Sequence, residues 1–313
     1  MLMLITSLRS MGVVRAVFKV MALAVSLALP AHAAIYSLPQ GESRLIGFPM
    51  EHRVEEGQTL DQIAQLYNMG FLALASANPE VDPLLPTPGT IIKLPSQMLL
   101  PDVPRKGVVV NLAELRLYYF DNANQRVHVF PIGIGVVGRE TPVVSTRISQ
   151  KRKNPTWTPT ATTRKKWIEE NGEALPRVVP AGPDNPLGHR ALRLGFGNGE
   201  YLIHGTNQEF GIGMRVSAGC MRLRYDDIET LFDMVRVGEP VRIINDAVKV
   251  ANEPDGWLIE VHEPLSDLVE LGRDEKELTI PLSVEKQLAV AMPDPVRLAQ
   301  AIADKSGVPS RLR

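Results

Sequence analysis

Two short stretches of this chain decide how its fold is interpreted: YLIHGT at residues 201–206 and RVSAGCMRL at residues 215–223. The first alternates like a strand and ends in His204 and Gly205. The second places Cys220 in a tight glycine turn ahead of a helical pattern. A histidine at a strand end, followed at this distance by a cysteine in a turn, indicates a cysteine–histidine nucleophile pair.

The chemistry of such a pair needs a thiolate, a base and a site for negative charge. A neighbouring imidazole accepts the thiol proton, and the thiolate is the nucleophile. Gly219 permits a turn whose amides, from Ala218, Gly219 and Cys220, point toward a developing oxyanion. Ser217 is a rival nucleophile, but a G-x-S-x-G elbow needs glycine where Arg215 stands. The alternative for Cys220 is an inert core cysteine.

Composition narrows the class of protein. The chain has 313 residues, 44% hydrophobic and 22% charged, which suits about two globular domains and not a fibrous or disordered chain. Its 24 glycines and 25 prolines favour a turn-rich, mainly β fold. The net charge of −1 gives no reason to expect a nucleic-acid partner. A single cysteine, Cys220, excludes an intramolecular disulfide, a cysteine zinc site and an iron–sulfur cluster.

The N-terminus has the pattern of a secretory signal peptide. A ten-residue apolar stretch at 20–29 follows a basic region and precedes the small-x-small triplet 31–33. The basic region contains Arg9, Arg15 and Lys19. Ten residues are too few to cross a bilayer, which needs about 20. We therefore expect residues 1–33 to be cleaved off after Ala33, with Met11 as an alternative start, and the mature protein to be exported without a transmembrane span.

Residues 50–95 predict a small β-α-α-β module. A short strand at 52–54 leads into a helix capped by Thr59. The apolar residues of that helix share one face: Leu60, Ile63, Ala64 and Tyr67. A second helix follows at 71–77, and a strand at 91–95 closes the module.

The remaining sequence predicts a β-rich domain at 107–246 and an α/β extension at 247–313. Arg126 and His128 are expected to face solvent from their strand. The single solid helix of the domain lies at 225–235. Strands are expected at 108–112, 115–120, 127–134 and 241–244 in the domain, and at 257–261 in the extension, which also holds a helix at 294–305. Connectors are expected at 34–48 and 95–106.

Three further patterns suggest other chemistry. Residues 133–138 match G-x-G-x-x-G after a strand, but no clear helix follows to meet a pyrophosphate, so we expect no dinucleotide. His262-Glu263 does not continue into H-E-x-x-H, so we expect no metal and no cofactor. Residues 141–168 are basic and hold Trp157, which fits either a loop that faces an anionic substrate or a solvated charge run.

These motifs resemble the L,D-transpeptidase family, whose catalytic domain is of the YkuD type. The most specific matches are IHGTN at 203–207 and SAGCMRL at 217–223, with VNLAELRLYY at 110–119 and VVPAGPDNPLG at 178–188. VEEGQTLDQIA at 54–64 and PGTIIKLP at 88–95 resemble a LysM module, which binds glycan strands of peptidoglycan or chitin. The implied fold is a mainly β catalytic domain, β-sandwich or barrel-like, with one main helix after the cysteine. The alternative for the module is a small adaptor that binds nothing.

The resemblance implies roles for the site residues. Cys220 is the implied nucleophile and His204 the implied general base, with the Gly205 carbonyl orienting the imidazole. The amides of Ala218, Gly219 and Cys220 form the implied oxyanion hole. One position departs from the family, which usually has histidine two residues before the cysteine, where this chain has Ala218. We therefore expect altered pH dependence or substrate handling, and not loss of activity.

Three more residues are expected on the substrate side of the site. Arg222 either pairs with a carboxylate of the peptide or braces the turn. Ser217 is expected to contact substrate, and Trp157 with the basic segment at 141–168 is expected to form a lid.

The implied function is periplasmic acyl transfer from peptidoglycan tetrapeptide stems. Cys220 would form a thioester with the third stem residue and release D-Ala. Three acceptors stay open: a lysine of an outer-membrane lipoprotein, a diaminopimelate amine that gives a 3→3 crosslink, or water, as in an L,D-carboxypeptidase. Residues 203–213 resemble the lipoprotein-anchoring branch. The alternative from another class is a non-catalytic cell-wall binding protein that uses the LysM-like module.

Overall fold

The computed structural model of the chain describes residues 34–136, 138–265 and 278–313. The predicted signal peptide and its cleavage site lie outside these residues. Across the part that is described, no helix has the length and apolar character needed to cross a membrane.

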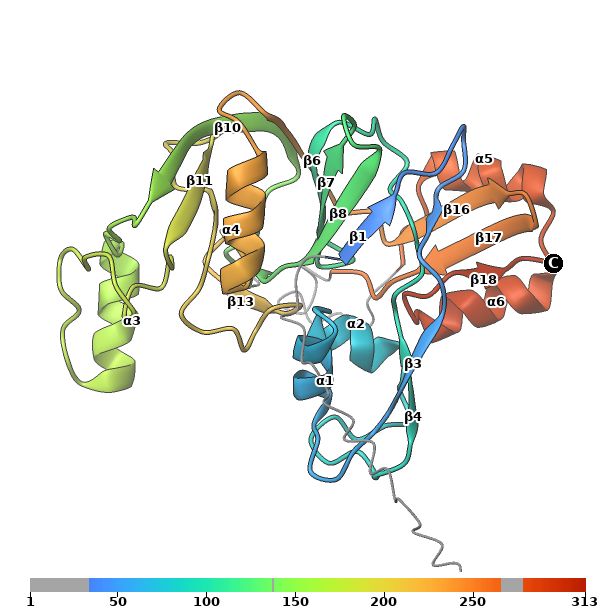
Figure 1. Cartoon of the computed structure of the whole chain (residues 1–313), viewed down its shortest axis with the longest axis horizontal. Helices are drawn as coiled ribbons and strands as arrows, with labels where there is room; N and C mark the ends of the chain where they lie inside the picture. Colours follow the sequence, from blue (N-terminus) through green and yellow to red (C-terminus); the bar gives the residue numbers. More distant parts are fainter. Residues whose placement is uncertain (1–33, 137, 266–277) are drawn as a thin grey trace, which may run out of the picture. The chain divides into compact units, whose positions relative to one another are not determined.

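A nine-stranded sheet organises the structure (Figure 1). Its strands follow the order β1-β8-β7-β6-β15-β10-β11-β12-β14, and valine and isoleucine supply six of the ten residues of β6 and β15. The bounds are β1 Ala34–Ser37, β6 Gly107–Asn111, β7 Arg116–Asp121, β8 Arg126–Pro131, β10 Val144–Lys153, β11 Arg190–Leu194, β12 Leu202–His204, β14 Met221–Arg222 and β15 Pro240–Ile244. Helix α4 (Tyr225–Met234) packs Ile228, Leu231 and Phe232 into the same core as the sheet. The predicted mainly β architecture with one helix after the cysteine is confirmed.

Strands β6, β7 and β8 are buried on both faces. Leu117 and Phe130 pack into the core that α4 covers, whereas Tyr118 and Val127 pack into a second cluster on the opposite face. His128 is therefore only 7% exposed, and the prediction that it faces solvent is wrong, because a strand covered on both sides has no solvent face.

Three other local predictions are corrected by pairing and packing. Residues 34–48 are not a plain connector, because β1 pairs with β8 at the edge of the large sheet. Residues 95–106 are not a free linker, because β5 (Met98–Leu99) pairs with β2 (Leu45–Ile46). The basic segment is not a loop but strand β10 followed by helix α3 (Ala161–Asn171), which Thr160 caps.

The β-α-α-β module forms as predicted. It consists of β3 Met50–Arg53, α1 Leu60–Leu66, α2 Phe71–Ser76 and β4 Ile91–Leu94. Thr59 and Gln62 form a reciprocal capping box at the start of α1. The buried apolar residues of the module form their own small core around Leu60, Ile63 and Ile92.

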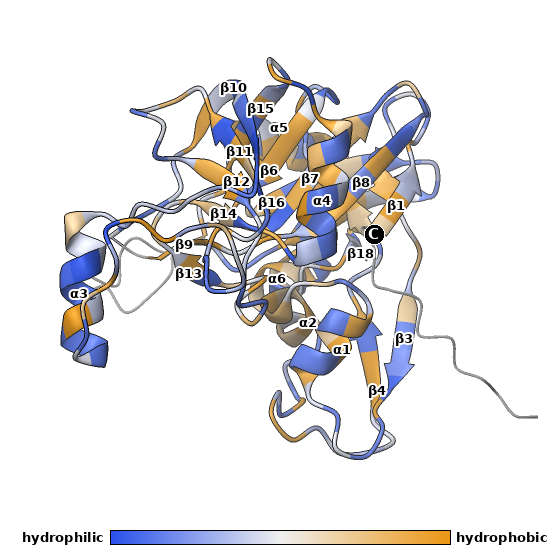
Figure 2. Ribbon diagram, turned by 60° about the vertical axis from the view of Figure 1, so that its left-hand side comes forward, coloured by the Kyte–Doolittle hydropathy of each residue, from blue (hydrophilic) through white to orange (hydrophobic). Residues whose placement is uncertain are grey.

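The C-terminal extension is an α/β unit with its own three-stranded sheet, ordered β16-β17-β18. The predicted strand and helix correspond to β17 (Gly256–Val261) and α6 (Pro295–Asp304). The remaining elements are β16 Val248–Glu253, α5 Leu282–Ala291 and β18 Ser310–Arg311. Figure 2 shows hydrophobic residues along the central strands β6 and β7 of the large sheet.

A buried charge network joins this extension to the large sheet. Lys249 Nζ lies 3.0 Å from Glu114 and 2.9 Å from Glu260, and Arg116 Nη1 lies 3.2 Å and 3.3 Å from the same two carboxylates. Burial raises the pKa of Glu260, but Lys249, His262 and Arg116 together outweigh it and hold that pKa well below its usual value. The network is stable because each buried charge has an opposite partner.

We predict that Lys249→Met destabilises the protein by about 3–5 kcal/mol, because it removes a buried cation that contacts both carboxylates of the network. Urea unfolding at pH 7 measures the loss. Lys166→Met is the matched control, since Lys166 forms an exposed pair with Glu170 and its loss costs less than about 0.5 kcal/mol. Equal stability of the two variants would contradict the account.

Candidate active site

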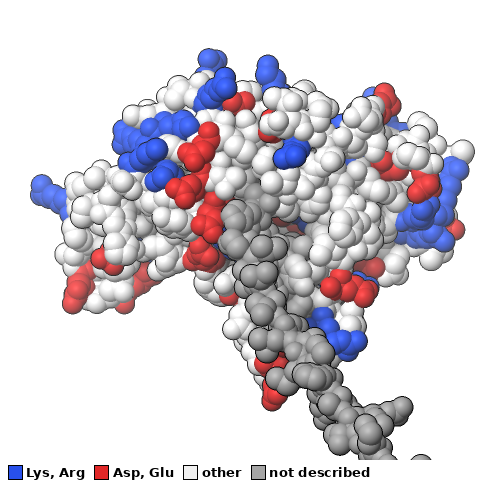
Figure 3. Space-filling model, viewed as in Figure 1, with Lys and Arg blue, Asp and Glu red and all other residues white. Residues whose placement is uncertain are grey.

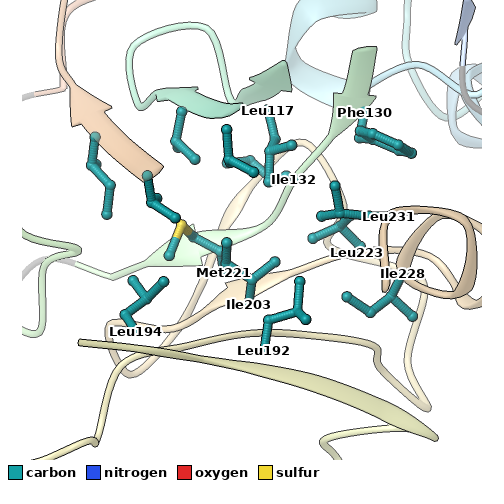
Figure 4. Packing of buried hydrophobic residues seen from close by; sticks show 14 of the residues in the cluster. Leu117, Phe130, Ile132, Leu192, Leu194, Ile203, Met221, Leu223, Ile228 and Leu231 are labelled. Atoms are coloured by element: carbon teal, nitrogen blue, oxygen red, sulfur yellow. The ribbon is translucent and has the colours of Figure 1, made fainter. Parts of the chain in front are cut away.

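The register of β12 and β14 places the predicted site residues on one face of the sheet. These strands are parallel, with Ile203 beside Met221 and His204 beside Arg222. Ile203 and Met221 are fully buried and point into the core (Figure 4). Because side chains alternate along a strand, His204, Arg222 and the preceding Cys220 project from the opposite face.

The turn before Cys220 depends on glycine. Gly219 has φ +100°, and a Cβ there would lie 3.2 Å from Tyr201 Cε1 and 3.3 Å from the Glu140 carbonyl oxygen. The turn is held from both sides: Thr141 Oγ1 donates to the Gly219 carbonyl at 3.0 Å, and Ser217 Oγ donates to the Cys220 carbonyl at 2.5 Å. Ser217 is 4% exposed, so its hydroxyl serves the turn itself.

His204 is a buried, neutral imidazole. His204 is only 3% exposed. Its Nδ1 donates to the Gly205 carbonyl at 2.5 Å, so Nε2 carries the lone pair that can accept a proton. Burial, with a smaller effect from the positive charge of Arg222, lowers the pKa of His204 to about 4. Carbonyl groups of Gly205 and Leu187 oppose this shift without cancelling it.

Cys220 is a neutral thiol. Sγ donates to the Glu200 carbonyl at 3.3 Å. Burial raises the thiol pKa above its ordinary value, while a backbone hydrogen bond from Leu202 and the charge of Arg222 act in the opposite direction. The two side chains are therefore a thiol and an imidazole on one face, and not a preformed ion pair.

Arg222 is the positively charged residue next to His204 and Cys220. Burial lowers the pKa of its guanidinium, and the charge of Cys220 raises it. Its backbone pairs with Gly133 in both directions, at 2.8 Å and 2.9 Å, which anchors the strand that follows the turn. Gly133 belongs to the sequence pattern that resembled a dinucleotide motif, and its structural use is this strand pairing.

Trp157 lies in the segment between β10 and β11, where its backbone pairs with Val179 at 2.9 Å and 2.8 Å. Among the described residues, no hydrogen bond or ring contact joins its side chain to Cys220 or His204. The structure thus brings together Cys220, His204, Gly205 and Arg222, and it places Trp157 on a separate segment.

The sequence did not predict that the small module docks beside the site. Asn68, from the end of α1, donates to Asp227 at 2.7 Å and accepts from Arg224 at 2.6 Å. All three residues are buried. Burial raises the pKa of Asp227 to about 7, a shift that hydrogen bonding from Asn68 and the charge of Arg224 reduce.

The module also contacts the chain between His204 and Cys220. The amides of Phe71 and Leu72 donate to the carbonyls of Ile212 and Gly213 at 3.4 Å and 3.3 Å. A Cβ on Gly213 would lie 2.3 Å from the Cα of Gly70, so the two backbones meet at glycine. No short motif marks these contacts, because they join residues more than 130 positions apart.

One group of side chains has metal-ligating character: Glu114, Glu260 and His262, whose ligand atoms lie within 4.8 Å of one another. Lys249 Nζ sits 3.0 Å and 2.9 Å from the two carboxylates. The ammonium group already supplies the positive charge that a cation would bring, so this cluster fits an ion network better than a metal centre.

Comparison with known proteins gives three family matches. The model of the L,D-transpeptidase catalytic domain (YkuD) matches residues 105–243, that of the L,D-transpeptidase C-terminal domain matches 247–312, and that of the LysM domain matches 52–95. The probable L,D-transpeptidase YcfS of Escherichia coli K12 is 49% identical over 300 residues, which cover 95% of this chain and 93% of the relative. The probable L,D-transpeptidases YbiS and ErfK/SrfK of the same strain are 45% and 46% identical, over 90% of this chain and 93% and 91% of theirs.

We predict that Gly219→Ala destabilises the protein by about 1–3 kcal/mol, because alanine is strained at this φ and crowds Tyr201. It should also change the rate at which iodoacetamide alkylates Cys220. Gly57→Ala is the matched control, because Gly57 also has a positive φ but nothing lies within 4 Å of its added Cβ. The control should lose stability without any change in alkylation. An unchanged alkylation rate in Gly219→Ala would refute the role given to the turn.

We predict that the imidazole of His204 stays neutral from pH 8 down to about pH 5 and becomes protonated near pH 4. A buried group with a lowered pKa gains its proton only when pH falls through the folded value. Alkylation of Cys220 should accordingly show a midpoint above that of an ordinary cysteine thiol, since burial raises its pKa. NMR titration of the histidines and the pH profile of alkylation measure the two values. An alkylation midpoint near pH 6 would mean that a thiolate–imidazolium pair exists at rest.

Proposed function

The chain belongs to the L,D-transpeptidase family, and we propose that it is a periplasmic cysteine acyltransferase acting on peptidoglycan tetrapeptide stems. The resemblance inferred from the motifs is thereby confirmed at the level of the family. The observation that carries the proposal is the β12–β14 register, which presents Cys220 and His204 from one face of a rigid sheet. Catalytic groups on strands are held more precisely than groups on loops.

In the proposed reaction, the Cys220 hydrogen turns from the Glu200 carbonyl toward Nε2 of His204, which takes the proton. Sγ forms a bond to the carbonyl carbon of the third stem residue, meso-diaminopimelate. The amides of Ala218, Gly219 and Cys220 stabilise the oxyanion. The bond to D-Ala then breaks, His204 returns the proton to the leaving amine, and a thioester remains.

The second half of the reaction reverses these proton transfers. An acceptor amine gives a proton to Nε2 of His204 and attacks the thioester carbonyl. The new amide forms, the carbon–sulfur bond breaks, and Cys220 recovers the proton. The carbonyl of Gly205 keeps Nδ1 protonated throughout, so Nε2 is the atom that exchanges protons.

The remaining residues receive supporting roles in this proposal. Arg222 stabilises the thiolate by its charge and braces the turn by its backbone. Ser217 holds the turn through its hydroxyl and stays a proposed substrate contact. The usual family histidine is replaced by Ala218, and we assign the base role to His204, whose Nδ1 hydrogen bond leaves Nε2 as the acceptor atom. Trp157 stays a proposed substrate contact.

For the domains, we propose that residues 50–95 bind glycan strands, that 107–246 carry the catalysis and that 247–313 support it. The acceptor is proposed to be a lysine amine of an outer-membrane lipoprotein, which the resemblance of residues 203–213 favours. A diaminopimelate amine and water are the other acceptors. The rival proposal, a non-catalytic wall-binding protein, is supported by the LysM match alone.

We predict that a carbapenem adds covalently to the purified protein and that Cys220→Ala abolishes the adduct. Intact-protein mass spectrometry measures the added mass. His204→Gln should slow the acylation by roughly 10²- to 10⁴-fold, because it removes the base without removing the nucleophile. A wild-type protein that remains unmodified would favour the wall-binding alternative. Muropeptide analysis of cells that overexpress the protein then identifies the acceptor, since 3→3 dimers and lipoprotein-linked stems differ in mass.

A further inference from the structure

A pocket of about 230 Å³ opens beside the proposed site. Its walls come from β10, β11, β12 and the chain that leads into and out of the segment carrying α3. The lining residues are Arg152, Pro155, Thr156, Leu187, Ala191, Arg193, Gly199 and Leu202. Two of these eight residues are charged, and both are arginines, so the pocket suits an anion.

Strand register puts the pocket on the same face as the thiol. Arg152 pairs with Ala191, which pairs with His204, and Arg193 pairs with Leu202. Paired residues share a face, so the two arginines project to the side that carries His204 and Cys220. Neighbouring strands lie about 4.8 Å apart, which puts the strand of Arg193 roughly 10 Å from the strand of Cys220.

One hydrogen bond orients the guanidinium of Arg193. Its Nη2 donates to the Asn198 carbonyl at 3.0 Å. A Cβ on Gly199 would lie 1.6 Å from the same nitrogen, so only glycine at 199 leaves room for the guanidinium. That hydrogen bond uses one of the five N–H donors of an arginine. Arg152 is also braced, since its Nε donates to Gln150 at 3.1 Å.

The wider surface carries the same sign of charge. Lysines and arginines gather over the end of β10 at the left of Figure 3, with acidic side chains beyond them toward α4. On the far face of β10 and β11, Arg190 is neutralised by Glu229 at 2.7 Å, whereas Arg152 and Arg193 pair with no carboxylate of the described residues. Close to the thiol, the negative charge of Glu200 contributes to raising the pKa of Cys220.

We propose that this pocket binds a carboxylate on the acyl side of the donor stem, through Arg193 with Arg152. The inference rests on the proposed function and names what that site recognises. A stem carries free carboxylates on its D-Glu residue and on the side chain of diaminopimelate, about seven and about six bonds from the scissile carbonyl carbon. Six bonds of about 1.5 Å span roughly 7 Å, and an arginine side chain covers the remaining distance to the strand. Guanidinium–carboxylate pairs are charge-assisted and directional, so they orient as well as attract.

The test compares three donors: a disaccharide-tetrapeptide with both carboxylates free, one with the D-Glu carboxylate amidated and one with the diaminopimelate side-chain carboxylate amidated. D-Ala release gives kcat/KM for wild type, Arg193→Gln and Arg152→Gln. With the free acid, Arg193→Gln should lose about 10- to 100-fold in kcat/KM. With one of the two amides, wild type should fall to a similar level and the variant should lose little more. The amide that behaves so identifies the carboxylate.

Lys153→Gln is the matched control, because Lys153 follows Arg152 on the same strand but projects from the opposite face. It should retain wild-type kcat/KM with all three donors. Iodoacetamide, an uncharged reagent, should alkylate Cys220 at the same rate in every variant, which reports an intact site.

Two outcomes would overturn the pocket and leave the proposed function standing: wild-type kcat/KM in both arginine variants, or an equal loss on all three donors. A wild-type protein that releases D-Ala from no donor at all would instead refute the proposed function.

Discussion

The pairing of β12 with β14 is the constraint on which the site depends. It involves only two residue pairs, which lie on opposite faces of the sheet. Ile203 and Met221 enter the large hydrophobic core, and His204 and Arg222 project from the other face. A slip by one residue would turn the imidazole of His204 into the hydrophobic core, away from its polar partner, and would turn Met221 out of that core. The apolar side of this register therefore fixes the position of the polar side. The nucleophile is placed by hydrophobic packing and needs no hydrogen bond to its base to be positioned.

A shell of polar contacts then fixes the chain around this pairing. Asn68 of the small module bridges Arg224 and Asp227, which lie within seven residues of Cys220. Thr141 and Ser217 hold the turn from opposite sides. Further from the thiol, the network around Lys249 joins the C-terminal extension to the large sheet. Asn68 pairs with buried groups of a distant part of the chain, although within the described residues Arg224 Nε and Asp227 Oδ2 stay without a hydrogen-bond partner.

The sequence predicted local features well and long-range ones poorly. Strand alternation, the cap at Thr59 and the glycine before Cys220 each follow from neighbours in the chain, and helices α1, α4 and α6 appeared where their apolar residues repeat. His128 was misassigned because alternation reports one covered face, and β8 has two. Strand β1 was missed because its pairing with β8 lies some ninety residues away. Asn68 gave no signal, since an asparagine at a helix end is ordinary until its distant partners are known.

The electrostatic state of the site has a consequence for its compartment. Burial favours the neutral forms of both Cys220 and His204, so little thiolate exists before substrate arrives. Thiolates, and not thiols, are the forms that oxidise readily. In the proposed periplasmic setting, a permanent ion pair would make this single cysteine vulnerable, with no second cysteine to return it from an oxidised state. The thiol becomes nucleophilic only as its proton moves to His204, when a substrate carbonyl carbon is present. The readily oxidised thiolate therefore exists only during the reaction. Arg222 then acts late, because its charge stabilises the thiolate only once the thiolate forms.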